Sequence, residues 1–211
     1  MWLFKEKPFR NWKALWQNKT VGLAEITGSR TFYGRKDGRM GSIVLDFFSK
    51  YPVMTVSVLG SILGTILSYI APGFTYNYLS AKEDFGPGNL GLTVFVHANW
   101  GHLIGNLMIM FAPSIICQKK YGCKSIFILL AVFALYTGLV CIPCKRGSVG
   151  FSGCAYMMLA MACVYGHHIW GYILLVYFFI ISCISDIGTR SNKLNHISGY
   201  VFGTAAGLLL Q

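Results

Sequence analysis

Residues 147–185, GSVGFSGCAYMMLAMACVYGHHIWGYILLVYFFIISCIS, contain no charged side chain, and this stretch decides the class of fold. A membrane-spanning helix needs about 20 apolar residues. The stretch is therefore long enough for two helices, and its segment 166–171 predicts the break between them. Four further uncharged stretches occur in the chain: 51–81, 85–118, 125–144 and 194–211. We predict six spanning helices, near 52–72, 98–117, 125–143, 150–166, 170–187 and 194–210.

The composition agrees with a membrane protein. Of the 211 residues, 55% are hydrophobic and only 12% are charged, whereas a soluble domain carries about 25% charged residues. So few polar side chains cannot cover a globular surface, and a disordered chain needs the opposite balance. The net charge of +11 is not gathered on a polar module, so nucleic-acid binding is not expected. The predicted class is an all-α polytopic membrane protein.

Residues 1–50 form a basic segment, with ten Lys and Arg side chains against four Asp and Glu. Aromatic residues lie between the cations, at Trp2, Phe4, Phe9, Trp12 and Trp16. Such a segment suits the surface of an anionic membrane, although a solvated tail with a few anchoring aromatics fits equally well. We expect a cytoplasmic N-terminal segment at 1–50 and a membrane domain at 51–211.

Lys and Arg placement predicts the orientation, because cytoplasmic loops carry an excess of both. With the N-terminus inside, six helices place thirteen cations on the inner side and five on the outer side. We therefore expect both termini in the cytoplasm, and the cell (plasma or inner) membrane as the location.

Three polar clusters lie inside the apolar stretches, where such groups are costly and are candidates for function. The second span begins with His102 and Asn106, which are four residues apart and share a helix face. The fourth begins near Ser152 and the sixth near His196. Under the predicted topology these spans all run from outside to inside, so the clusters fall at one depth near the outer surface. This coincidence predicts one shared site.

The residue types in these clusters suit acyl transfer. A serine hydroxyl is a weak nucleophile unless a base takes its proton, and His196 is the predicted base for Ser152. The backbone N–H of Ser152, the Asn106 amide and His102 are expected to stabilise the oxyanion. The only acid beyond residue 84 is Asp186, so a Ser–His dyad is expected rather than a triad. No metal or cofactor is implied.

Small residues and one tyrosine are expected to support the dyad. Gly150 and Gly153 allow backbone and neighbouring helices to approach the serine. Tyr156 lies one turn beyond Ser152, where its ring is expected to stack on the base. Gly199 and Gly203 give the sixth helix a face of small residues, and we expect it to pack closely on the fourth helix.

Together these residues resemble the rhomboid family of intramembrane serine proteases. The resemblance comprises H-x-x-x-N at 102–106, G-x-S-G at 150–153 and H-x-x-G-x-x-x-G at 196–203, in the family's order and spacing. It covers roughly 52–210, the whole of the predicted six-helix bundle.

The resemblance implies cleavage of membrane-anchored proteins in or near a transmembrane segment whose helix is locally weak. It implies Ser152 as nucleophile, His196 as base, and transmembrane proteins and membrane lipids as partners. His97 falls where the family often has a second histidine, above the oxyanion site.

The chain departs from the family's pattern in two places. The first outer loop, about 73–96, is short and has no Trp-Arg pair, and Gln118 stands where many relatives have a glutamate. Inactive relatives lack the serine or histidine, or have a proline just before the serine position. This chain has Phe151 there, so an active enzyme is expected.

Two alternatives remain open from the sequence. A six-helix protein without catalytic activity would use the polar site to bind or transport a client. A thiol-redox or metal role would rest on the C-x-x-C pair Cys141 and Cys144, which no second ligand pair accompanies. The sequence leaves the substrate and the oligomeric state undetermined.

Overall fold

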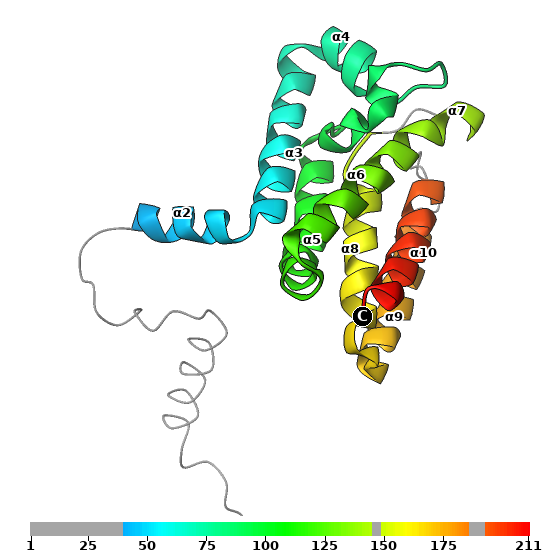
Figure 1. Ribbon diagram of the computed structural model, residues 1–211. Helices are drawn as coiled ribbons and strands as arrows, with labels where there is room; N and C mark the ends of the chain where they lie inside the picture. The colour runs from blue at the N-terminus through cyan, green and yellow to red at the C-terminus, as the bar shows by residue number, and fades with distance from the viewer. Residues whose placement is uncertain (1–39, 145–148, 186–192) are drawn as a thin grey trace, which may run out of the picture. The chain divides into compact units, whose positions relative to one another are not determined.

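The computed structural model describes residues 40–144, 149–185 and 193–211 (Figure 1). Contacts divide the chain into two units, Met1–Ile43 and Val44–Gln211. Residues 1–39 of the predicted basic segment, which include the aromatic residues named above, lie outside the described residues, as does Asp186. The following description concerns the second unit.

A helix lies at each of the six predicted positions. These are α3 (Pro52–Ile70), α5 (Trp100–Tyr121), α6 (Cys123–Leu139), α8 (Ser152–Val164), α9 (Ile169–Ser185) and α10 (Lys193–Leu209). Shorter elements are α2 (Met40–Lys50), α4 (Pro72–Phe74), the π-helix η1 (Thr75–Leu79), the 3₁₀-helices η2 (Pro87–Leu90), η3 (Leu92–Phe95) and η4 (Tyr165–His167), and α7 (Cys141–Cys144). No strand occurs among the described residues, so the all-α prediction is confirmed.

Three helical segments are long and apolar enough to cross a membrane: Pro52–Ile70, Trp100–Tyr121 and Cys123–Pro143. The other three helices of the set are shorter. The 13 residues of α8, at about 1.5 Å per residue, cover about two thirds of a hydrocarbon core of about 30 Å. The helix positions are therefore as predicted, whereas length and composition support membrane crossing for three of the six.

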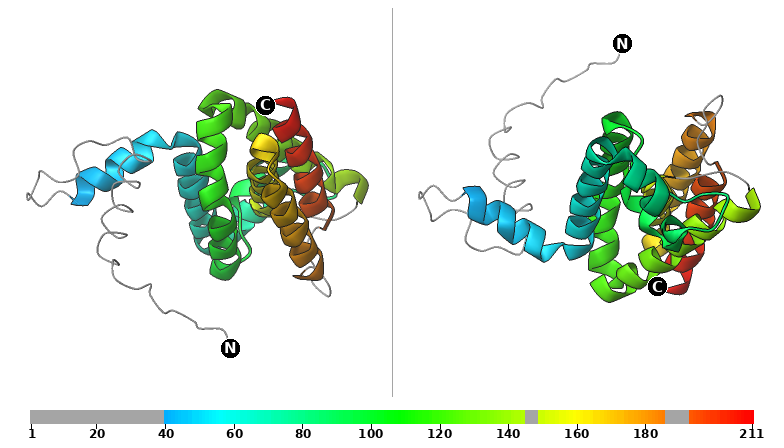
Figure 2. Two further views of the ribbon diagram at one scale, coloured as in Figure 1. Left: turned by 90° about the horizontal axis from the view of Figure 1, so that it is seen from below. Right: turned by 90° about the horizontal axis from the view of Figure 1, so that it is seen from above.

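Helices α5, α8 and α10 run in the same direction, with α8 between the other two (Figures 1 and 2). At one end, Ser152 of α8 contacts His196 of α10. At the other end, the Tyr121 hydroxyl of α5 donates to the carbonyl oxygens of Met161 at 3.1 Å and Gly207 at 3.4 Å. The ends where these three helices begin therefore meet, as the shared-depth prediction requires.

The core surrounds α8, most of whose side chains are buried. Its methionines and small residues pack against α5, α6 and α10, with Phe133 and Met110 among the buried residues of the cluster. On the opposite face, a second cluster contains Tyr200 and the partly buried Phe179. The serine helix is thus held on several sides by neighbouring helices.

The chain between α3 and α5 is folded tightly, and Asn89 holds it in place. Asn89 is fully buried, and its amide uses both donors and both acceptor positions. It donates to the carbonyls of Lys82 at 3.0 Å and of Gly138 in α6 at 2.8 Å. It accepts from the N–H groups of Gly86 at 3.0 Å and Lys82 at 3.4 Å. This loop is therefore attached to α6 even without a Trp-Arg pair.

Gln118 has a specific role at the far end of α5. Its side-chain oxygen accepts from the Val53 N–H at 3.0 Å, and its nitrogen donates to the Lys50 carbonyl at 2.9 Å. It therefore binds the chain at the junction of α2 and α3 through a neutral amide.

Candidate active site

Ser152 and His196 lie in direct contact. The Ser152 hydroxyl and His196 Nε2 are 2.8 Å apart, a hydrogen bond between residues 44 positions apart in the chain. Ser152 is the first residue of α8 and His196 lies in the first turn of α10. Both side chains are half-buried. The distance suits proton transfer from hydroxyl to imidazole.

The turn before Ser152 is held by the loop that precedes α5. Gly150 has φ +110°, which only glycine adopts readily, and its N–H donates to the Thr93 carbonyl at 3.0 Å. The next N–H, of Phe151, points at Nε2 of His97 at 3.4 Å. The two residues before the serine are thus both attached to this loop.

His97 is completely buried. Burial, and secondarily the neighbouring His102, lower the pKa of His97 to about 4. The imidazole is therefore neutral near pH 7, and its Nε2 has the lone pair that accepts the Phe151 N–H. The resemblance placed His97 above the oxyanion site. Its ring does lie beside His102, with centroids 5.2 Å apart, and its contact with the serine turn was not predicted.

The predicted oxyanion donors gather around Gly150. A Cβ atom on this glycine would lie 2.7 Å from Cε1 of His102 and 3.5 Å from Nδ2 of Asn106. Asn106 is buried, and its Nδ2 has no hydrogen-bond partner among the described residues. The Ser152 N–H is in the first turn of α8, where N–H groups have no intrahelical partner. A group developing negative charge here would have the Asn106 amide and the first-turn N–H of Ser152 as candidate donors.

Asn99 fixes the start of α5 and hence the position of His102. Its side-chain oxygen accepts the His102 N–H at 2.8 Å, an N-cap that ends the loop and begins the helix. The cap explains why α5 begins at Trp100 rather than at residue 98.

The predicted supporting residues are also placed at the dyad. The rings of Tyr156 and His196 have centroids 4.9 Å apart at 63°, so they are in contact edge-on rather than stacked as predicted. A Cβ on Gly199 would collide with the Gly153 carbonyl, and one on Gly203 with the Met157 carbonyl. Gly153 itself packs against Phe133 of α6 and the Asn195 carbonyl. Helices α8 and α10 therefore approach at backbone distance, which brings Ser152 and His196 together.

The structure describes the side chain of one cysteine of the C-x-x-C pair. Cys141 is buried and its thiol donates to the Thr137 carbonyl at 3.3 Å. The Cys144 side chain lies outside the described residues. Within the described part of the chain, no group of three or more His, Cys, Asp or Glu residues is arranged to hold a metal ion.

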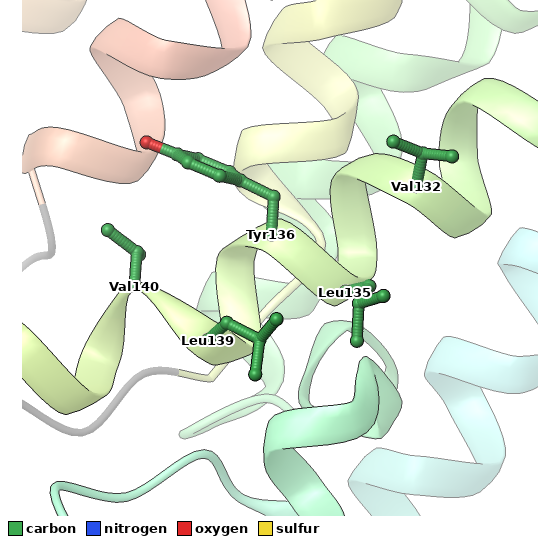
Figure 3. A pocket seen from close by; sticks show the side chains of 5 residues that line it. All are labelled: Val132, Leu135, Tyr136, Leu139 and Val140. Atoms are coloured by element: carbon green, nitrogen blue, oxygen red, sulfur yellow. The ribbon is translucent and has the colours of Figure 1, made fainter.

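An apolar groove of about 420 Å³ lies on α6. It is lined by Val132, Leu135, Tyr136, Leu139 and Val140 (Figure 3). Tyr136 extends from it toward α10, where its hydroxyl lies 2.7 Å from that of Ser198. None of the lining residues belongs to the predicted site.

Two contributors to the site were missed from the sequence. Thr93 acts through its backbone carbonyl, which no side-chain pattern reveals. Asn89 acts at a distance by holding the loop that contains Thr93. Asn89 lies between Gly88 and Gly91, a pattern that predicts a turn. The pattern does not predict that the Asn89 side chain binds α6.

Comparison with known proteins shows the family of this chain. The rhomboid domain family matches residues 89–211, which include every predicted site residue. None of the curated proteins compared with the chain matches it. Members of the rhomboid family are generally serine intramembrane proteases, and the apolar helices here fit an integral membrane protein. Because the match covers more than half of the 211 residues, this protein belongs to the rhomboid family.

Proposed function

We propose that the protein is an intramembrane serine endopeptidase that cleaves membrane-anchored proteins with a Ser152–His196 dyad. The observation that carries the proposal is the 2.8 Å hydrogen bond between Ser152 and His196 Nε2. The buried Nδ2 of Asn106 beside Gly150, which has no partner within the part of the chain that the structure describes, adds a donor suited to an oxyanion. Family membership supports the same chemistry.

In the proposed reaction, Ser152 Oγ attacks the scissile carbonyl while its proton passes to His196 Nε2. The carbonyl oxygen becomes an oxyanion that the Ser152 N–H, Asn106 and His102 stabilise. As the C–N bond breaks, the imidazolium returns its proton to the leaving amine, and an acyl-enzyme remains on Ser152. Water then attacks this ester, with His196 again taking and returning the proton, which releases the acid product and the free serine.

The proposed substrates are transmembrane proteins with a locally weak helix, because an extended backbone has to reach Ser152. We place the site near the outer surface of the cell membrane, with both termini in the cytoplasm. The distribution of Lys and Arg supports this orientation. A C-terminal reporter that is active only in the cytoplasm should be active, and an inactive reporter would reverse the proposed orientation.

Labelling with a fluorophosphonate in detergent tests the proposed function. The wild-type protein should be labelled, whereas Ser152→Ala and His196→Ala should each abolish both labelling and proteolysis while remaining folded. Asn106→Ala should keep partial activity, because other donors remain. A folded wild type that is never labelled, beside a labelled rhomboid as positive control, would favour the alternative of a client-binding protein without catalytic activity.

A further inference from the structure

Beyond the dyad, a row of aromatic rings connects His196 to α9. Tyr156 contacts His196 on one side and stacks on Tyr200 on the other, with centroids 4.9 Å apart at 27°. Tyr200 in turn meets Phe179 of α9 edge-on, with centroids 5.3 Å apart at 89°. The row therefore passes from the proposed base, through α8 and α10, to a third helix.

The spacing of these residues along α8 and α10 places the two tyrosines in a second layer next to the dyad. Tyr156 follows Ser152 by four residues on α8, and Tyr200 follows His196 by four on α10. Residues four apart share a helix face, so the interface between the two helices has the dyad in one layer and the tyrosine pair in the next. Tyr156 touches both layers, because its ring faces His196 and Tyr200.

Tyr200 is the enclosed member of the row. It is 4% exposed and packs among Leu159, Ala160 and the partly buried Phe179. A cavity of about 60 Å³ lies beside it, lined by residues of α9 and α10 that include His196 and Tyr200. Replacing the Tyr200 ring with a smaller side chain would enlarge this cavity. The Tyr156 ring could then move away from His196.

We propose that Tyr200 is a positioning residue for His196, acting through the Tyr156 ring, and that Phe179 holds Tyr200 from α9. This inference rests on the proposed function, because it concerns how the base is oriented. In this arrangement the Tyr156 ring meets the imidazole edge-on and is itself stacked on Tyr200. A change in the packing of α9 would therefore change the position of His196 relative to Ser152.

The substitutions that test the proposal separate the ring from the hydroxyl. Tyr200→Leu removes the stacked ring, whereas Tyr200→Phe keeps it and removes only the hydroxyl, which faces Ser182 of α9. Phe179→Leu removes the outer support and leaves α10 unchanged. Phe202→Leu is the matched control, because Phe202 is an aromatic residue of α10 that packs on Phe133 instead, at 5.5 Å.

Labelling of the full-length protein by a fluorophosphonate gives kinact and KI separately. We expect Tyr200→Leu to lower kinact by about tenfold or more, the scale of effect from small misplacements of a catalytic group, with KI unchanged. Phe179→Leu should lower kinact in the same direction, while Tyr200→Phe and Phe202→Leu should stay within about twofold of wild type. Equal kinact in wild type, Tyr200→Leu and Phe179→Leu, or an equal loss in Phe202→Leu, would overturn the proposal. If Tyr200→Leu does not fold, Phe179→Leu decides.

The NMR signals of the His196 imidazole give a readout that does not depend on activity. Ring currents from Tyr156 act on these signals, so Tyr200→Leu should shift them and Tyr200→Phe should restore the wild-type positions. If the fluorophosphonate does not label the wild-type protein, that result would contradict the proposed function but not the positioning role. The imidazole signals would still report the orientation of the His196 ring. Signals that Tyr200→Leu leaves unmoved would contradict the positioning role whatever the labelling result.

Discussion

The side chains that carry the proposed chemistry were accessible from the sequence, because each is a polar group in an apolar helix. Ser152, His196, Asn106 and His102 stand out by their cost in a membrane. His97 is different, since its partner is the backbone N–H of Phe151 at 3.4 Å. Such a contact depends on how two distant segments meet, and no pattern of side chains shows it.

The pH dependence of stability should reveal the buried His97. Its pKa is about 4 in the folded protein, below the ordinary value of about 6.5 that applies on unfolding. Between pH 6.5 and 4 the unfolded chain therefore binds the extra proton, so the free energy of unfolding falls as the pH is lowered through this range. We expect the melting temperature in detergent to decrease accordingly, with the full contribution present above pH 6.5.

The matched variant for this measurement is His97→Gln, whose side-chain oxygen can accept the Phe151 N–H but does not titrate. Its melting temperature should fall less than that of wild type between pH 6.5 and 4. Parallel curves for the two proteins would show that His97 titrates normally in the folded state.

At the scale of elements, the contact between α8 and α10 follows from glycine spacing in the sequence. Gly199 and Gly203 were predicted to bring the two helices together, and both meet backbone carbonyls of α8. The attachment of the loop before α5 to α6 does not follow from any spacing in the sequence. Its attachment depends on Asn89 reaching the Gly138 carbonyl at 2.8 Å, 49 residues along the chain. Periodicity gives helices and their faces, whereas loops depend on individual hydrogen bonds.

Adding one methyl group at Gly203 should separate α8 from α10. A Cβ there collides with the Met157 carbonyl, and overpacking of this kind costs about 1–3 kcal/mol. We expect Gly203→Ala to lower both the melting temperature and the rate of fluorophosphonate labelling. Gly105→Ala is the control, because a Cβ at that position meets no atom within 4 Å. It should leave stability unchanged or raise it by about 0.5–1 kcal/mol. A destabilised Gly105→Ala with an unaffected Gly203→Ala would contradict this packing.

Asn89→Ala should loosen the loop that holds the serine turn. The substitution leaves buried N–H and carbonyl groups of the loop and α6 without partners, which we expect to cost at least about 2 kcal/mol. Asn77→Ala is a fair comparison in the same loop region, since Asn77 is exposed and its side-chain oxygen accepts from the exposed end of a lysine, Lys82 Nζ, at 3.1 Å. It should change stability by less than about 0.5 kcal/mol. Thermal denaturation compares the two, and equal effects would remove the special role of Asn89.

At the scale of the whole molecule, uncharged stretches and the placement of cations were enough to predict the helices and the common end of three of them. Helix boundaries were less accessible, because they depend on local caps. Asn99 begins α5, and Gly122, with φ +83°, separates α5 from α6. Span length was also overestimated for α8, which begins at Ser152 itself and ends after 13 residues.

The most direct measurement is fluorophosphonate labelling of purified full-length protein, followed by mass spectrometry of the modified peptide. The probe should modify Ser152, and His196→Ala should abolish the reaction in a protein with wild-type thermal stability. Modification at another residue, or undiminished labelling of Ser152 in His196→Ala, would contradict a Ser152–His196 dyad.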